Sequence, residues 1–176
     1  SGKTSMSVKL LYGEETYLLE TKLKKIKKEF GDLVKGINYI QIDESNITEL
    51  IDDIETPAFG FSKKLIVVRD SGLFKKEKKS AKGQEATQNK LAEKIANYIS
   101  ENGSIFEEAV ELVFIEENVE KNNLYKVIEQ NGIIMPFPLL KLPELISNIQ
   151  KICNAYKVKI DNASTKYFIE MCGTNM

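Results

Sequence analysis

The chain has 176 residues, 42% of them hydrophobic, and its 25 Lys and Arg against 26 Asp and Glu give a net charge of -1. This balance argues against bulk electrostatic attraction to nucleic acid or to an anionic membrane, although local basic runs can still matter. The sequence contains no His, which removes Ser-His and Cys-His nucleophilic pairs and the commonest general base at neutral pH. The class of enzymes is thereby disfavoured without being excluded, and we expect no catalytic site, metal or cofactor in this chain.

The sequence also predicts a location. No signal peptide is recognisable, and no apolar run approaches the length of about 18 residues that a membrane span needs. The two cysteines, Cys153 and Cys172, are too widely spaced in the sequence to indicate a disulfide framework or a metal site. We therefore expect a reduced, cytoplasmic protein that does not contact a membrane.

Short apolar runs alternate with amphipathic segments over the first part of the chain. The runs that predict strands are Val8–Tyr12, Tyr39–Ile42 and residues 65–68, 110–115 and 133–135. The run Leu-Ile-Val-Val at 65–68 is apolar on both faces, as is typical of a central parallel strand. About five alternations of strand and helix predict a three-layer α/β domain with a parallel sheet over residues 6–142.

Helices are expected between these strands. Residues 14–30 place Leu19, Leu23, Ile26 and Phe30 on one helical face. Asn46 followed by Glu49 resembles a capping box and predicts the start of a second helix. This helix should end near Thr56, because Pro57 disfavours helical geometry in the residue before it. Further helices are expected around residues 91–99 and 124–131.

A second unit is predicted after the α/β domain. Pro143 suits the first turn of a new helix, and a further helix is expected from about Asp161 to Gly173. These helices have no obvious partners within the chain. Residues 143–176 therefore indicate the start of a helical second domain that the chain does not complete.

The connection after the first predicted strand is where a phosphate-binding loop would lie. Only Gly13 remains there, the Gly-Lys pair of such a loop is missing, and Glu14 and Glu15 would repel phosphate. The Gly-Lys-Thr at residues 2–4 precedes a strand instead of following one, so we interpret it as linker. This stretch is typical either of a nucleotide-binding fold without its nucleotide site or simply of an acidic helix N-terminus.

The segment at residues 56–64 carries two aromatic rings on a short connection. Phe59 and Phe61 flank Gly60, and Pro57 and Ala58 precede them. Each exposed Phe forgoes about 1.5–3 kcal/mol of burial free energy. Both rings could fold back on the core, or at least one could face outward as a hydrophobic anchor for a partner protein.

Two charged runs are candidate sites. Lysines between residues 75 and 82, chiefly Lys75, Lys76, Lys78 and Lys79, could contact nucleic-acid phosphates, but a solvated loop is the favoured interpretation. The run has no Arg, and its only aromatic neighbour is Phe74, which disfavours stacking on single strands. The acidic residues are expected to form a solvated face; they are Glu107, Glu108, Glu111, Glu116 and Glu117.

Two segments carry a resemblance to a known family. Residues 10–15 with residues 17–20 resemble the opening of the delta subunit of the bacterial DNA polymerase III clamp loader. Residues 55–69, from Glu-Thr-Pro-Ala-Phe-Gly-Phe to Val-Val-Arg, resemble that family's second signature. The stretch around Phe137, Leu142 and Leu145 and the end at residues 172–175 resemble the same family. The resemblance extends over nearly the whole chain in order.

The resemblance implies a fold and a function. The family has an AAA+-like architecture in three domains, and its first domain has lost ATP binding. It binds and opens the ring-shaped sliding clamp with a hydrophobic pair, which corresponds here to Ala58 and Phe59. The family often has a larger apolar residue in place of Ala58, which suggests that Phe61 shares the task beside Pro57. The collar domain that joins the loader is expected to be absent from this chain. The resemblance implies the sliding clamp as partner, with the other loader subunits in the full-length protein and DNA only indirectly.

Two other classes of function remain as alternatives. One is a degenerate P-loop ATPase, which the missing Gly-Lys-Thr after the first strand disfavours. The other is a direct nucleic-acid binder that uses the lysines of residues 22–28 and 75–82. Both are ranked below a clamp-binding module that serves the DNA polymerase III holoenzyme without catalysing a reaction itself.

Overall fold

The computed structural model describes residues 6–76, 83–140 and 142–157. Its strands are β1 (Val8–Tyr12), β2 (Tyr39–Ile42), β3 (Lys64–Arg69), β4 (Val110–Glu116) and β5 (Ile133–Pro136). Its α-helices are α1 (Thr16–Phe30), α2 (Leu50–Glu55), α3 (Gln84–Glu101), α4 (Gly103–Glu108), α5 (Asn123–Asn131) and α6 (Leu142–Lys157). A 3-10 turn, Ile47–Glu49, leads into α2. Two compact units divide between residues 138 and 139.

The five strands form one sheet in the order β2-β3-β4-β1-β5, and every pair is parallel. In β3 all four residues of the Leu-Ile-Val-Val run are at most 2% exposed. A strand that is apolar on both faces needs a covering layer on each side of the sheet. The Leu-Ile-Val-Val run therefore predicted a central strand between two helical layers. The expected α/β fold with a parallel sheet is confirmed.

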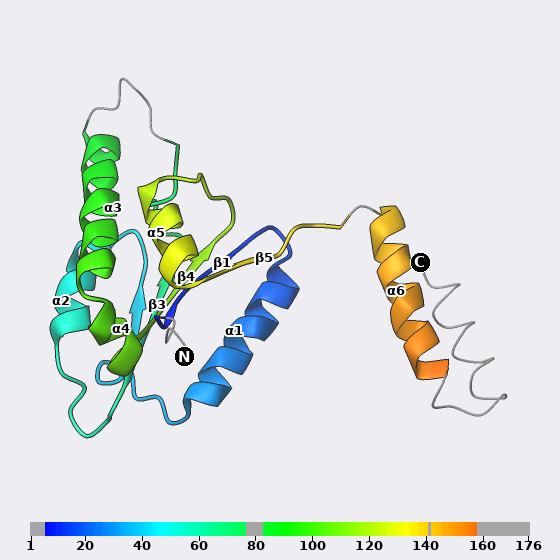
Figure 1. The fold of residues 1–176 in the computed structure, drawn as a ribbon, viewed down its shortest axis with the longest axis horizontal. Helices are drawn as coiled ribbons and strands as arrows, with labels where there is room; N and C mark the ends of the chain where they lie inside the picture. The colour runs from blue at the N-terminus through cyan, green and yellow to red at the C-terminus, as the bar shows by residue number, and fades with distance from the viewer. Residues whose placement is uncertain (1–5, 77–82, 141, 158–176) are drawn as a thin grey trace. The chain divides into compact units, whose positions relative to one another are not determined.

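Alternate residues of the strands supply two separate cores. On one face Leu65 and Val67 pack with Leu19 and Leu23 of α1. On the other face the larger cluster joins Ile66 and Val68 to the helices α2–α5. Figure 1 shows α1 on one side of the sheet and the other helices of this unit on the opposite side. The unit therefore has three layers.

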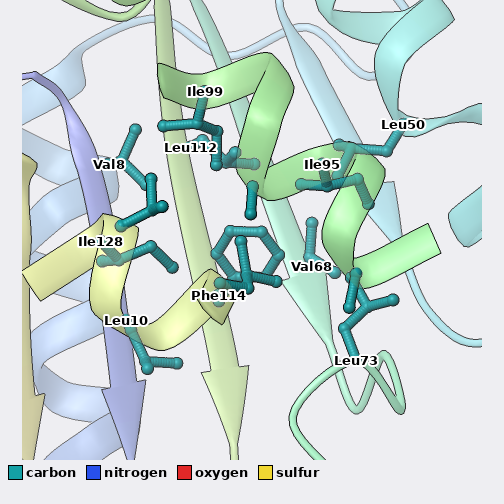
Figure 2. Packing of buried hydrophobic residues seen from close by; sticks show 14 of the residues in the cluster. Val8, Leu10, Leu50, Val68, Leu73, Ile95, Ile99, Leu112, Phe114 and Ile128 are labelled. Atoms are coloured by element: carbon teal, nitrogen blue, oxygen red, sulfur yellow. The ribbon is translucent and has the colours of Figure 1, made fainter. Parts of the chain in front are cut away.

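The larger core lies against the middle of the sheet. Figure 2 shows Phe114 of β4 between Leu10 of β1 and Val68 of β3, with Ile95 and Ile99 of α3 above them. The ring of Phe114 meets that of Phe74 edge to face, with centroids 5.4 Å apart. The first turn after β3, which carries Leu73 and Phe74, is thus part of the core and holds the carboxyl end of β3 in place.

Two local expectations are wrong, and one helix was not predicted. The capping box is not formed, because Asn46 makes no cap bond; its Oδ1 accepts instead from the amide of Asp43 at 2.8 Å. Helix α4 was not expected; Glu107 and Glu108 lie on it and are exposed, as predicted for a solvated face. Glu116, the last residue of β4, is 7% exposed and not solvated, because its carboxylate is held by the amide and hydroxyl of Ser71 in the turn after β3.

The second unit contains α6, and residues 158–176, where a further helix was expected, lie outside the described residues. Cys153 in α6 is buried, and Cys172 lies outside the described residues. Among the described helices, none combines the length and the apolarity needed to cross a bilayer.

Candidate protein-binding site

The loop at residues 56–63, here called the Phe59 loop, connects α2 to β3 at the amino-terminal edge of the parallel sheet. It projects below α2 in Figure 1. The loop continues into a central strand that is hydrogen-bonded on both sides, to β2 and to β4. The carboxyl end of the loop is therefore anchored to a strand that pairs on both sides.

A tight turn forms the tip of this loop. The amide of Phe61 donates to the carbonyl of Ala58 at 2.9 Å, and Gly60 has a φ of 87°. A β-turn whose third residue has positive φ is of type II, and glycine is favoured there because it has no Cβ. Phe59 therefore occupies the second position of the turn, at its tip, where its side chain projects away from the two segments that enter and leave the turn.

The two rings differ in exposure. Phe59 is 80% exposed, so the interpretation in which at least one ring faces outward is confirmed for this residue. Phe61 is half-buried and lines two hollows, one on each side of it. Pro57 is exposed and Ala58 is half-buried. The four predicted residues thus lie together, with Phe59 presented and Phe61 supporting the turn.

The hollows beside Phe61 differ in chemistry. One, of about 290 Å³, lies between the end of α2 and α4 and has apolar walls that include Ile54, Ile105 and Val110. The other, of about 430 Å³, is bordered mainly by polar groups, among them Glu29, Asp32, Asn38, Ser62, Lys63 and Glu111. The surface around Phe59 is therefore apolar toward α4 and polar toward α1.

Lys64 supports the loop, and sequence reasoning missed it. Its ammonium donates to the carbonyls of Asp53, at 2.7 Å, and of Thr56, both at the end of α2. The residue is 2% exposed, and burial lowers the pKa of the ammonium, an effect that the nearby Asp53 carboxylate opposes. A lysine at the start of a strand buried on both faces was the available signal, since lysine is rarely buried without a partner.

The predicted lysine site lies elsewhere. Lys75 and Lys76 are exposed and follow the carboxyl end of β3, whereas the Phe59 loop precedes its amino end. Lys78 and Lys79 lie outside the described residues. The structure does not bring the described lysines together with Phe59.

The edge of the sheet where a phosphate would bind is closed by the chain itself. Only three residues, 13–15, separate β1 from α1. The carboxylate of Glu15 accepts from the amides of Tyr17, at 3.0 Å, and Leu18, at 3.4 Å. These are the helix N-terminal amides that hold phosphate in P-loop proteins. A Cβ on Gly13 would meet the carbonyl oxygen of Phe137 at 2.1 Å, so the backbone of that residue also occupies this edge.

Two polar contacts order the same edge. The guanidinium of Arg69 pairs with both oxygens of Glu20, at 2.5 and 3.0 Å. The buried Glu116 carboxylate accepts from the hydroxyl of Ser71 at 2.6 Å and from its amide at 3.1 Å. Burial raises the pKa of Glu116, which the Ser71 bonds partly offset. Across the described residues no cluster of three or more His, Cys, Asp or Glu is arranged to hold a metal.

Comparison with known proteins gives a family. The model of the family "DNA polymerase III, delta subunit" matches residues 10–137. The structure is similar to the Bacillus subtilis DNA clamp loader delta protein, with a TM-score of 0.63 at 21% identity over 86% of this chain and 44% of that one. It also overlaps, at a TM-score of 0.45 and 14% identity, with a DNA polymerase III gamma subunit-related protein of Thermotoga maritima.

The curated proteins gave no match. This chain spans less than half the length of the Bacillus protein. The match to the Bacillus protein and the parallel sheet confirm the expected α/β fold. The family model covers both segments that carried the resemblance, the opening at residues 10–20 and the second signature at residues 55–69. The chain belongs to the DNA polymerase III delta subunit family.

Proposed function

We propose that this chain is the clamp-binding part of a clamp-loader delta-type subunit, which binds and opens the ring-shaped DNA sliding clamp during replication. The single observation that carries the proposal is Phe59, 80% exposed at the tip of a hydrogen-bonded turn in a member of this family. Phe59 is the anchor, Phe61 and Ala58 form the base of the turn, and Pro57 leads into it. Central aromatic anchors dominate the energetics of protein interfaces.

The mechanism is differential binding. A partner can shift an equilibrium between closed and open clamp only by as much as its affinity differs between the two states. We propose that the Phe59 ring fits a pocket that is better formed in the opened clamp. Because the turn is held by β3 and α2, little ordering of the loop is required at the moment of binding.

In this proposal the chain does not bind ATP, and other loader subunits hydrolyse it. The support is the closed carboxyl edge of the sheet. The P-loop motif G-x-x-x-x-G-K-[ST] is longer than the three residues between β1 and α1. The Glu15 carboxylate also takes the amides that would bind phosphate. A calorimetric titration with ATP and magnesium should give no heat of binding; measurable binding would favour the P-loop-like ATPase instead.

The proposed partners are the sliding clamp, the other loader subunits in the full-length protein, and DNA indirectly. A cytoplasmic location is part of the same proposal, because the replication machinery works there. Salt-dependent binding of the chain alone to DNA would support the nucleic-acid alternative.

The test compares two exposed aromatic residues. Phe59→Ala should weaken binding to the cognate sliding clamp by about 2 kcal/mol, or about thirtyfold, as expected of an interface anchor. Tyr17, 76% exposed in the first turn of α1, is the matched control. Its replacement by Ala removes a similar ring from the opposite edge of the sheet and should leave the affinity unchanged. Equal affinities for all three proteins would refute the assignment of Phe59.

A further inference from the structure

We infer that Lys64 is a positioning residue, which holds the turn that carries Phe59 in its binding conformation; this rests on the proposed function of the Phe59 loop. Lys64 does not face the solvent and cannot itself contact a clamp, since it is 2% exposed. Its role would be to connect the two ends of the loop.

The contacts of Lys64 close the loop on itself. Its amide donates to the carbonyl of Ala109 at 2.9 Å, so its backbone is fixed to the residue that precedes β4. Its ammonium then reaches back over the loop to the carbonyls of Asp53 and Thr56. Thr56 is the first residue of the Phe59 loop and Lys64 follows its last. A non-covalent connection therefore joins both ends of an eight-residue loop, 56–63.

The carbonyls that Lys64 binds would otherwise lack partners within the helix. The last carbonyls of an α-helix have no intrahelical donors, and the helix dipole makes them favourable sites for a cation. The amide of Thr56 and its hydroxyl both bond to the carbonyl of Asp52, at 3.0 and 2.7 Å, which completes the end of α2. The position at which the chain leaves α2 is thereby fixed from both sides.

Within the closed loop, little freedom is left to the tip. Pro57 has a fixed φ, and the bond between Phe61 and Ala58 sets the turn. If the Lys64 connection is lost, the turn can pivot about residues 56–57 and 62–63 while its internal hydrogen bond persists. The Phe59 ring would then sample many orientations, and binding would have to order it.

The mobility of the tip can be measured without any partner. The sequence contains no Trp, so Phe59→Trp provides a single fluorophore at the tip, and its time-resolved anisotropy reports the local motion. Adding Lys64→Met, which keeps the length and removes the donors, should increase the amplitude of fast motion about twofold or more. Lys64→Arg, which keeps a donating cation, should restore much of the order, and Lys25→Met, on the exposed face of α1, should have no effect.

A merely structural role of Lys64 predicts a different result. In that case Lys64→Met lowers the melting temperature but leaves the anisotropy decay of the folded protein unchanged, which would overturn the inference. Thr56 is exposed, so water can replace the lysine at its carbonyl. Circular dichroism verifies folding, and if the Met variant does not fold, Lys64→Gln, which keeps a shorter donor, serves in the same measurement.

A double-mutant cycle of clamp affinities then tests whether the mobility of the tip affects binding. Lys64→Met should weaken clamp binding about tenfold when Phe59 is present, and less than about twofold in a Phe59→Ala background. Equal losses in both backgrounds would show that Lys64 does not act through Phe59. If Phe59→Ala alone has no effect on binding, the proposed function of the loop fails, whereas the anisotropy result still decides the role of Lys64.

Discussion

Replacing Phe59 by Ala should leave the folding stability almost unchanged, in contrast to the replacement of a core Phe. Because Phe59 is 80% exposed, only about a fifth of its side chain is removed from water on folding. With about 1.5–3 kcal/mol for a fully buried ring, the expected loss is about 0.3–0.6 kcal/mol. Phe74 is 1% exposed and packs against Phe114. Its replacement by Ala should cost about 3–5 kcal/mol.

Urea unfolding followed by far-UV circular dichroism measures both losses, with equal m-values as the sign that the unfolded states are comparable. A loss above about 1 kcal/mol for Phe59→Ala would show that the ring is buried in solution, and would refute the reasoning that leaves it free for a partner. A residue whose replacement lowers the folding stability little but lowers the binding affinity strongly serves binding and not folding.

Two further predictions concern the closed edge of the sheet. Gly13→Ala should destabilise the fold by about 1–3 kcal/mol in urea unfolding, because the new Cβ would clash with the Phe137 carbonyl. Gly31→Ala is the control, since Gly31 also has positive φ but nothing lies within 4 Å; equal losses would attribute the effect to φ alone. Burial raises the pKa of Glu116 above its ordinary value of 4.5, so the folded state holds its proton to higher pH and the wild type should lose stability as the pH rises from 4.5 through the folded pKa. Glu116→Gln, which keeps an acceptor for Ser71, should remove this loss, and parallel pH profiles of unfolding would contradict the assignment.

The periodicity of apolar residues predicted most of the secondary structure. A buried strand such as residues 65–68 and the helical face of Leu19, Leu23 and Ile26 follow from local pattern, because each element must cover its apolar side. Helix α4 was missed because its six residues are too few to show a helical period. Glu116 was misassigned because a carboxylate at the end of a strand is solvated or buried according to what the neighbouring turn covers.

The sequence indicated the position of the candidate site, and the structure showed which of its side chains are exposed. Pro57, Phe59, Gly60 and Phe61 on one short connection already indicated a loop with surplus apolar surface. Local pattern could not distinguish the two rings, because exposure depends on which residues from α2, α4 and β4 surround each of them. The buried Lys64 was not considered, since its partners are backbone carbonyls that no sequence pattern specifies.

The sequence by itself determined the α/β class, the family and the position of the Phe59 loop, because these depend on short-range periodicity and on residue types at fixed spacing. The tertiary structure decided that Phe59 points outward while Phe61 supports the turn, and that the Glu15 carboxylate accepts from the first amides of α1. It also decided that Lys64 joins the loop ends. The physical reason is that exposure, ion pairing and loop closure depend on groups far apart in the chain, which only folding brings together.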